Sequence, residues 1–222
     1  VQSVPGKKQF VEKVGDYTVL TTSINYASTR DLMLKRLMDI AGGLVGCLIT
    51  GILFIFVAPA IYIASPGPIF FAQERVGKNG KRFKMYKFRS MRVNAAEDSA
   101  WSTNSDPRKT RFGSIIRKFS LDELPQFFNV LKGDMSLVGP RPEIPFHVEH
   151  FKEEIPRYLV RQQVRPGLTG WAQINGLRGD TDIAERIRYD IWYIENWTVA
   201  LDIKILFRTV FGGKMVNDEK IQ

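Results

Sequence analysis

The sequence has few of the side chains that build disulfide frameworks or metal cages. Cys47 is the one cysteine in 222 residues, which excludes a disulfide framework and a cysteine-based zinc site. His147 and His150 are the two histidines, too few for a histidine-rich metal site. Internal repeats and low-complexity tracts are also missing, and 44% of the residues are hydrophobic. These features exclude a disordered or collagen-like chain and predict a folded protein with a substantial core.

Acidic side chains are outnumbered by basic ones. The chain has 23 Asp and Glu against 32 Lys and Arg, a formal net charge of +9. This balance indicates an anionic partner, which is a phosphate-bearing ligand, an anionic lipid surface or nucleic acid. No nucleic-acid recognition motif accompanies the charge, so we expect no nucleic-acid partner.

Charge of either sign is absent from residues 40–64, which form an apolar run of 25 residues. The mean hydropathy of −0.15 hides this segment. An uncharged stretch of at least about 18 residues is a candidate membrane helix. The run has no polar face, which argues against a helix in a soluble core, and it begins too deep in the chain for a signal peptide.

The flanks of the run predict its topology. Pro59 lies inside it and predicts a kink or break, because proline removes a helical hydrogen bond. Residues 1–36 hold six basic against three acidic side chains, and residues 71–92 hold eight against one. Because basic flanks favour the cytoplasmic side, both ends are expected there. We therefore favour a re-entrant helix over a spanning one, provided that the broken backbone finds hydrogen-bond partners.

Two features of the apolar segments stay open at this level. Gly42 and Gly46 form a GxxxG pattern, which allows close helix packing but reflects equally well the abundance of small residues in membrane helices. Residues 199–211 combine apolar side chains with Lys204 and Arg208. This composition suits either an interfacial helix or a core helix with a solvated edge.

The remaining sequence predicts a mixture of helices and short strands. Strands are expected at residues 17–22, 69–73 and 83–88, the last two joined as a hairpin through residues 77–80. Residues 94–110 are polar and are expected to form a loop. Helices are expected at residues 113–119, 122–132, 143–163, 182–196 and 199–211. The predicted fold class is α+β and mostly helical: a re-entrant membrane helix followed by a catalytic body with a small β-hairpin and amphipathic interfacial helices.

The adjacent carboxylates Asp122 and Glu123 are the strongest chemical signal. Basic residues surround them in the sequence, and a carboxylate near cations stays ionised, which suits a nucleophile or a Mg²⁺ ligand. The same pair also fits a capping box that begins at Ser120, since acids are favoured in the first turn of a helix. The two interpretations are compatible, because the start of a helix also attracts phosphate.

Several basic side chains are candidates for binding phosphate. Arg141 lies between two prolines, where a stiff backbone suits bidentate recognition, although a turn with an exposed arginine has the same pattern. Lys87 and Arg89 alternate along an expected strand and so share one face, either a cationic patch or a solvated surface.

Four further acids have structural interpretations. Asp190 and Asp202 are isolated in aromatic or apolar surroundings and suit salt bridges. Asp180 and Asp182 precede an expected helix and suit helix caps.

Five blocks of sequence, taken together, resemble the bacterial sugar transferases, the monotopic phosphoglycosyl transferases that load a phosphosugar onto a polyprenyl phosphate. The resemblance covers residues 31–211. So many long blocks in one order make it highly specific. The blocks read LKRLMDI, SPGPIFFAQERVGKNGKRFKMYKFRSM, FGSIIRKFSLDELPQFFNVLKGDMSLVGPRPE, VRPGLTGWAQING and NWTVALDIKILFRTVF.

The resemblance implies a reaction. Asp122 would attack the β-phosphate of a UDP-sugar, Mg²⁺ held at Asp122 would help to release UMP, and the covalent sugar-phosphoryl enzyme would then react with undecaprenyl phosphate. Glu123 would act as a base or position the metal and phosphate.

The same resemblance implies roles for further residues. Lys87, Arg117 and Arg141 match family positions near the phosphates, and we add Arg89 and Arg178 as phosphate-binding candidates. Asp202 matches a functionally sensitive acid, Asp190 is included with it, and Pro59 matches the proline that breaks a re-entrant helix.

The finer assignments also follow from the resemblance. The stretch QINGLRGDTDIAERIRYDIWYIENW is similar to the subgroup that uses UDP-glucose in exopolysaccharide or capsule synthesis, while UDP-galactose and N-acetylated UDP-sugars remain alternatives. A non-catalytic, membrane-tethered basic scaffold is the alternative of another class. We expect membrane lipids as partners and the catalytic body on the cytoplasmic side of the bacterial inner membrane; a homodimer is compatible with the sequence, which defines no interface.

Three regions are expected along the chain. Residues 1–30 resemble the tail of an accessory region that precedes the catalytic domain in larger members. Residues 31–66 would form the re-entrant membrane helix, and residues 67–222 the catalytic domain.

Overall fold

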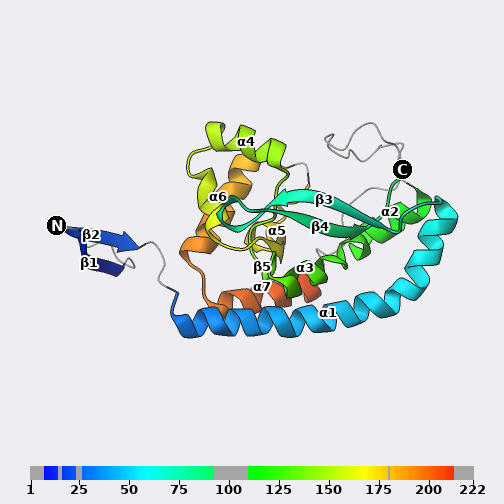
Figure 1. The fold of residues 1–222 in the computed structure, drawn as a ribbon, viewed down its shortest axis with the longest axis horizontal. Coiled ribbons are helices and arrows are strands. Elements are labelled where there is room, and N and C mark those ends of the chain that lie inside the picture. The colour runs from blue at the N-terminus through cyan, green and yellow to red at the C-terminus, as the bar shows by residue number, and fades with distance from the viewer. Residues whose placement is uncertain (1–7, 15–16, 24–26, 93–109, 180, 213–222) are drawn as a thin grey trace.

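The computed structural model describes residues 8–14, 17–23, 27–92, 110–179 and 181–212 (Figure 1). The expected loop at 94–110 and the expected cap at Asp180 therefore lie almost wholly outside the described residues. A hairpin of β1 (Lys8–Val14) and β2 (Tyr17–Ser23) precedes the long helix α1 (Thr29–Ala64). The predicted strand at 17–22 is confirmed, and its partner β1 was not predicted.

The body that follows α1 is mostly helical, as expected. The antiparallel hairpin consists of β3 (Phe70–Val76) and β4 (Arg82–Phe88), joined through η1 (Lys78–Gly80). Two short parallel strands, β5 (Ser136–Val138) and β6 (Gly167–Thr169), were not predicted. The α-helices are α2 (Arg111–Lys118), α3 (Gln126–Lys132), α4 (Pro145–Glu154), α5 (Trp171–Ile174), α6 (Ile183–Glu195) and α7 (Val199–Phe211). They are accompanied by the 3-10 helices η2 (Leu121–Glu123), a single turn, and η3 (Tyr158–Gln163), which is twice as long.

Two expected helices are interrupted at prolines. The expected helix 122–132 is divided into η2 and α3, because Pro125 has no N–H to donate to the carbonyl of Leu121 four residues earlier. The expected helix 143–163 is divided into α4 and η3 at Pro156, where the next residue, Arg157, adopts a left-handed conformation with φ 64°. The helices predicted at 113–119, 182–196 and 199–211 are confirmed, as is the Asp182 cap, whose Oδ1 accepts from the amide of Ala184.

The expected break at Pro59 is not seen. α1 continues through Pro59 as one helix of 36 residues, and in Figure 1 it curves upward over its last turns. Val57 and Ile61 on this curved part are buried against Phe88 and Ile116 of the body. The lost hydrogen bond is therefore accommodated in a bend that brings the end of α1 onto the body.

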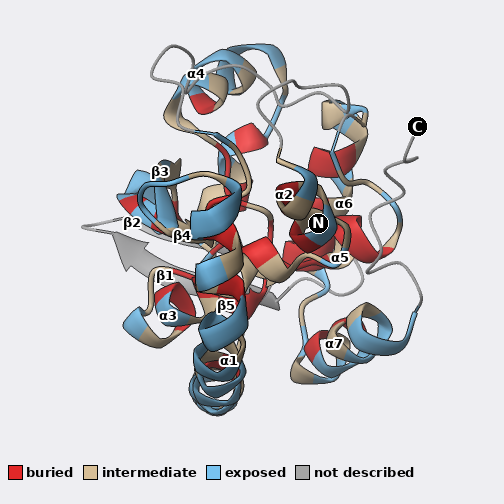
Figure 2. Ribbon diagram, turned by 90° about the vertical axis from the view of Figure 1, so that its right-hand side faces the viewer, coloured by how far each residue is buried: buried red, intermediate tan, exposed pale blue. Residues whose placement is uncertain are grey.

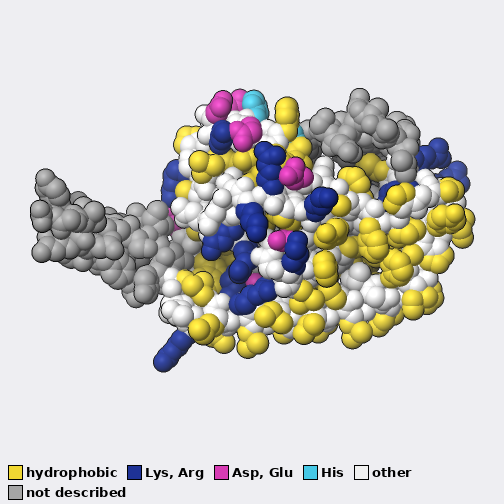
Figure 3. Space-filling model, viewed as in Figure 1, with side chains coloured by type: hydrophobic (Ala, Val, Ile, Leu, Met, Phe, Trp, Pro, Cys, Tyr) yellow, Lys and Arg dark blue, Asp and Glu magenta, His cyan; other side chains and the backbone are white. Residues whose placement is uncertain are grey.

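One side of the molecule is apolar. α1 is long and apolar enough to cross a membrane, and most of its apolar stretch is exposed. α7 lies on the same side as α1 in Figure 2, and Ile203, Phe207 and Phe211 on it are exposed. Hydrophobic side chains accordingly line this edge in Figure 3, with basic side chains gathered in a band above it. A contiguous exposed surface of this size is typical of membrane association.

Polar contacts hold the first turns of α1 to the body. Lys35 donates from Nζ to the Asp202 carboxylate at 2.6 Å and to the Val138 carbonyl at 3.0 Å. The guanidinium of Arg36 donates to the last carbonyls of α3, at 2.9 Å each. The buried carboxylate of Asp39 accepts from the hydroxyl of Ser136 and the amide of the following residue, also at 2.9 Å. All three residues therefore tie α1 to the body, and Lys35 and Arg36 contribute positive charge as well.

The small residues of the GxxxG pattern allow α1 to approach the body closely. A Cβ atom at Gly46 would lie 2.2 Å from ring atoms of Phe127 on α3, and one at Gly42 would lie 2.5 Å from Leu137. The packing interpretation of the pattern is thus confirmed, with the body of the same chain as the partner.

Gly46→Val should destabilise the protein, because the new methyl groups would collide with Phe127. We expect a loss of about 1–3 kcal/mol, seen as a fall of several degrees in the melting temperature in detergent. Gly51→Val, on the same helix, is the control, because a Cβ atom at position 51 would meet no other atom within 4 Å. Equal melting temperatures for the two variants would contradict the packing.

Lys35→Met should cost about 3–5 kcal/mol, because it leaves the fully buried Asp202 carboxylate without its cation. Adding Asp202→Asn should restore part of that loss by removing the uncompensated charge. Arg188→Met breaks an exposed pair with Glu185 and should change stability by less than about 1 kcal/mol. Thermal unfolding measures the stability of each variant. If Lys35→Met lowers the melting temperature no more than Arg188→Met does, the Lys35–Asp202 pair does not hold α1 to the body.

Candidate active site

The Asp122–Glu123 pair lies on the single turn η2, between α2 and α3 and against β4. α2 ends at Lys118, and Ser120 adopts a left-handed conformation with φ 55° that redirects the chain into this turn. The Ser120 side chain makes no cap hydrogen bond to the turn, so the expected capping box is not formed. The turn places two adjacent carboxylates in the interior of the body.

Glu123 is held by two cations from different parts of the chain. Lys87 on β4 donates from Nζ to Oε1 at 3.0 Å, and the Arg141 guanidinium donates to both carboxylate oxygens, with Nη1 3.4 Å from Oε2. Burial alone would raise the pKa of Glu123, but the charges and hydrogen bonds of Arg141 and Lys87 hold it well below its usual range. Glu123 is therefore an ionised carboxylate with its hydrogen-bonding capacity largely used.

Asp122 has a different environment. It is buried, and among the described residues nothing forms a hydrogen bond or ion pair with its carboxylate. Burial, together with the negative charge of Glu123, raises the pKa of Asp122 to about 6, while Lys87, Arg117 and Arg141 oppose the rise. Of the two neighbouring carboxylates, one is thus committed to cations and the other is available for chemistry.

The structure brings together most of the predicted basic residues. Arg117 on α2 lies within electrostatic reach of Asp122. Arg178, in the segment after α5, faces Arg141 and Glu123; burial first, and then the positive charge of Arg141, lower its pKa. The Nε atom of Arg178 is buried and has no hydrogen-bond partner. Several cations together with an unused donor on Arg178 form an arrangement that suits phosphate oxygens.

The structure places Arg89 elsewhere. Its guanidinium donates to the carbonyl of Ser65, at the end of α1, and the side chain is buried there. The Arg89 amide still donates to the Ile69 carbonyl at 2.9 Å just past the end of β4, but the side chain bonds at the end of α1. In this position Arg89 satisfies a carbonyl at the C-terminus of the long helix.

Asp190 and Asp202 both form buried salt bridges, as the salt-bridge interpretation predicted. Asp202 is fully buried and accepts from Lys35, from the Tyr193 hydroxyl at 2.7 Å and from the Trp197 indole at 3.1 Å. Asp190 pairs with Arg161 at 2.9 Å. Because Arg161 also donates to the Arg141 carbonyl, Asp190 supports the site indirectly.

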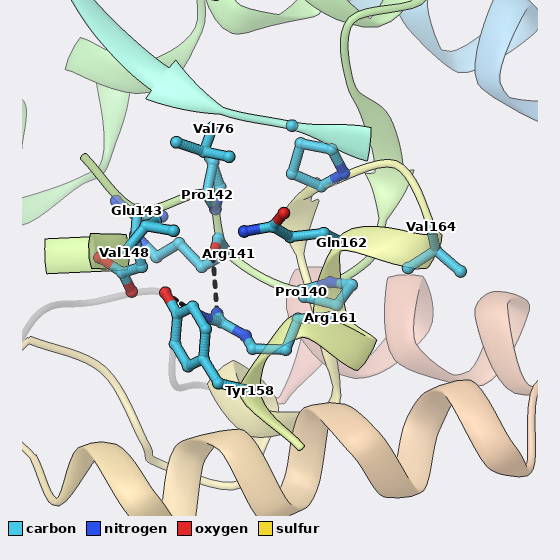
Figure 4. A pocket seen from close by; sticks show the side chains of 12 residues that line it. Val76, Pro140, Arg141, Pro142, Glu143, Val148, Tyr158, Arg161, Gln162 and Val164 are labelled. Carbon is cyan, nitrogen blue, oxygen red and sulfur yellow. Dashed lines mark hydrogen bonds between the residues drawn. The ribbon is translucent and has the colours of Figure 1, made fainter. Parts of the chain in front are cut away.

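The pocket in Figure 4 is lined in part by the Arg141 segment itself, residues 140–143. It is lined by Val76, Pro140, Tyr158, Gln162 and neighbouring residues. The charged groups in its wall are committed: Arg161 to Asp190 and to the Arg141 carbonyl, and Glu143 to Arg186. We therefore interpret this pocket as part of the packing that supports Arg141, and not as a binding site for a charged ligand.

Sequence reasoning missed Arg75. In the β3–β4 register Arg75 faces Phe83 while Phe71 faces Lys87, so Arg75 lies on the same inner face of the hairpin as Lys87. In the sequence, the alternation of basic and apolar side chains along 82–85 identifies the inner face of the hairpin, and the strand pairing places Arg75 on that face.

Comparison with known proteins connects this geometry to a family. The model of the bacterial sugar transferase family matches residues 30–214. A UDP-glucose:undecaprenyl-phosphate glucose-1-phosphate transferase of Escherichia coli is 47% identical over 186 residues, which are 82% of this chain and 40% of that protein. An Aeromonas hydrophila UDP-N-acetylgalactosamine-undecaprenyl-phosphate N-acetylgalactosaminephosphotransferase is 47% identical over 180 residues, 80% of this chain and 43% of that protein.

Coverage differs among the relatives. The chain spans less than half the length of the two proteins just named. By contrast, it matches 94% of an exopolysaccharide production protein of Rhizobium leguminosarum, at 45% identity over 81% of this chain. The family match spans α1, the hairpin, the Asp122–Glu123 turn and the Arg141 segment, and on this basis the chain belongs to the bacterial sugar transferase family.

Proposed function

We propose that this protein transfers a sugar 1-phosphate, with glucose the proposed sugar, from a UDP-sugar to undecaprenyl phosphate and releases UMP. The observation that carries the proposal is the uncommitted, buried Asp122 carboxylate beside Glu123, which Lys87 and Arg141 neutralise. The reaction agrees with the printed names of the Escherichia coli and Aeromonas hydrophila relatives. Exopolysaccharide or capsule synthesis is the corresponding setting.

The first step uses Asp122 as a nucleophile. An Asp122 carboxylate oxygen bonds to the β-phosphorus of the UDP-sugar, and the bond from that phosphorus to the bridging oxygen breaks. UMP leaves with the bridging oxygen and its electron pair. The product on the enzyme is an aspartyl phosphate that still carries the sugar.

The second step returns Asp122 to its original state. A phosphate oxygen of undecaprenyl phosphate bonds to the same phosphorus, the bond from Asp122 to phosphorus breaks, and a diphosphate-linked sugar is formed. One site therefore serves a soluble donor and a lipid acceptor in turn. The exposed faces of α1 and α7 support this order of events, since they would hold the site beside the membrane.

The cations make the approach of two anions possible. Arg117 lies near Asp122, and Arg178 has an unused buried donor near Arg141. We assign both to the donor diphosphate, together with Arg141 and Lys87, whose charges also neutralise Glu123. Fixed positive charges of this kind stabilise the negative charge that develops on the transferring phosphoryl group.

Asp122 also fits Mg²⁺. The described residues contain no group of three acidic, histidine or cysteine side chains that could enclose a metal. Mg²⁺ is commonly held by one or two carboxylates together with substrate phosphates, and the free carboxylate of Asp122 suits such a site. Bound Mg²⁺ would neutralise phosphate charge and help UMP to leave.

The membrane arrangement is part of the proposal. We propose that α1 enters and leaves the cytoplasmic side of the bacterial inner membrane, so that the body faces the cytoplasm. The basic flanks and the bend of α1 support this arrangement. The N-terminal end of α1 is tied to the body through Lys35, and its C-terminal end packs on the body through Val57 and Ile61.

Asp122→Asn should abolish UMP release, because an amide cannot act as the nucleophile. UMP release is measured with undecaprenyl phosphate and Mg²⁺ across UDP-glucose, UDP-galactose and N-acetylated UDP-sugars, and we expect UDP-glucose to be the preferred donor. Asp182→Asn is the control, since asparagine also caps helices well and activity should be kept. Full activity of Asp122→Asn would contradict the mechanism. If the unaltered protein turns over no UDP-sugar, the result would favour a non-catalytic scaffold.

Cysteine labelling tests the topology. In a Cys47→Ser background, Arg30→Cys and Pro68→Cys place single thiols at exposed positions on either side of the apolar segment. We expect both to react with an impermeant reagent only from the cytoplasmic side. Arg188→Cys on the body fixes the side of the catalytic domain, and thiols that react from opposite sides would show that α1 spans the membrane.

A further inference from the structure

The segment that carries Arg141 is held in an unusual way. Its neighbours Pro140 and Pro142 have no N–H, so the segment has few amides with which to anchor itself. Instead, four consecutive carbonyls accept hydrogen bonds from outside: Pro140 from the Gly167 amide at 2.9 Å, Arg141 from Arg161 at 2.8 Å, Pro142 from Arg75 at 3.2 Å, and Glu143 from the Val76 amide at 2.9 Å.

Arg75 is the side chain that braces this segment from the hairpin. Its Nη1 atom donates to the Pro142 carbonyl, and its Nη2 atom donates to the Gln73 amide oxygen at 2.6 Å. The planar guanidinium therefore connects two fixed points, one on β3 and one directly after Arg141. The amide of the next residue, Val76, adds a second connection at Glu143.

The charge of Arg75 is not used in an ion pair. Among the described residues no carboxylate lies within ion-pair distance of it, and its Nε atom is buried without a hydrogen-bond partner. Burial first, and then the charge of Arg141, lower the pKa of Arg75 to about 10, while Glu143 and Glu123 oppose the change. Keeping a second guanidinium beside Arg141 costs free energy, and an apolar side chain would fill the space without that cost.

We propose that Arg75 is a positioning residue that fixes the Arg141 segment so that the Arg141 guanidinium reaches Glu123 and the donor diphosphate. The reference to the diphosphate rests on the proposed function. Arg75 acts through the Pro142 carbonyl and does not itself touch the reacting atoms. The brace is complementary to the one from Arg161, which holds the Arg141 carbonyl and is fixed by Asp190.

Activity measurements test the effect on Arg141. Arg75→Gln should lower kcat/KM for the UDP-sugar about tenfold, the effect of losing a hydrogen bond to a charged group, with little change in melting temperature. Arg75→Lys should recover part of this, because one amine keeps the charge but cannot bridge both acceptors. Arg82→Gln, an exposed position on the same hairpin, is the control and should keep full activity.

A double-variant comparison separates positioning from general damage. If Arg75 acts through Arg141, Arg75→Gln should reduce kcat/KM by less than about threefold in an Arg141→Lys background. If the two single substitutions lower kcat/KM by factors that multiply fully in the double variant, the proposal is overturned. So would an Arg75→Gln variant that is as active as Arg82→Gln.

Amide hydrogen exchange gives a readout that does not depend on activity. Arg75→Gln should speed exchange at the Val76 amide and at the amides of residues 139, 141, 143 and 144, while residues 136–138 stay protected. If the unaltered protein releases no UMP, the proposed function fails, and the exchange measurement still decides whether Arg75 braces the segment. Unchanged exchange in Arg75→Gln overturns the brace in either case.

Discussion

The neutralisation of one half-buried carboxylate, Glu123, is the interaction on which the rest of the site depends. An ionised carboxylate in the interior is costly unless cations and hydrogen bonds surround it. Lys87 and Arg141 meet this requirement and use the oxygens of Glu123 in doing so. The adjacent Asp122 lies near the same cations without a hydrogen bond to them, and this asymmetry is the reason that we propose Asp122, and not Glu123, as the reacting group.

That interaction depends on elements distant from each other in sequence. Lys87 comes from the hairpin and Arg141 from a proline-rich segment 54 positions later, so each must be fixed by its own surroundings. β4 is fixed in part by Asn129 on α3, which donates to the Lys84 carbonyl at 2.8 Å and accepts from the Tyr86 amide at 3.1 Å. The Arg141 segment is fixed by its four external hydrogen bonds. The β3–β4 hairpin therefore contributes to both supports, because it carries Lys87 and also holds the Arg141 segment through Arg75 and Val76.

Local patterns predicted most of this architecture. The hairpin, α2, α6, α7 and the apolar helix follow from periodicity and turn residues close together in sequence. The pairing of β5 with β6 is parallel and joins residues about 30 apart, and three-residue strands carry no periodic signal. Asp122, Glu123, Lys87, Arg117, Arg141 and Arg178 came together as expected.

The failures share a physical origin. Arg89 was assigned from strand alternation, but the strand ends one residue before it, and the end of α1 supplies the acceptor that it meets. Arg75 was missed because its partners are a glutamine on its own strand and a backbone carbonyl from 67 positions away. Backbone acceptors have no sequence signature, so contacts made to them are visible only once the chain is folded.

The same backbone contacts connect the membrane helix to the chemistry. Asp39 on α1 holds the Leu137 amide, and Lys35 holds the Val138 carbonyl, so α1 fixes both sides of β5. β5 leads within three residues to Arg141, which reaches Glu123. The ties are short and buried, and a displacement of α1 would therefore be passed to Arg141 and not absorbed in a loop. Under the membrane arrangement proposed above, the position of α1 in the lipid would therefore fix where the Arg141 guanidinium meets the phosphate of a lipid acceptor.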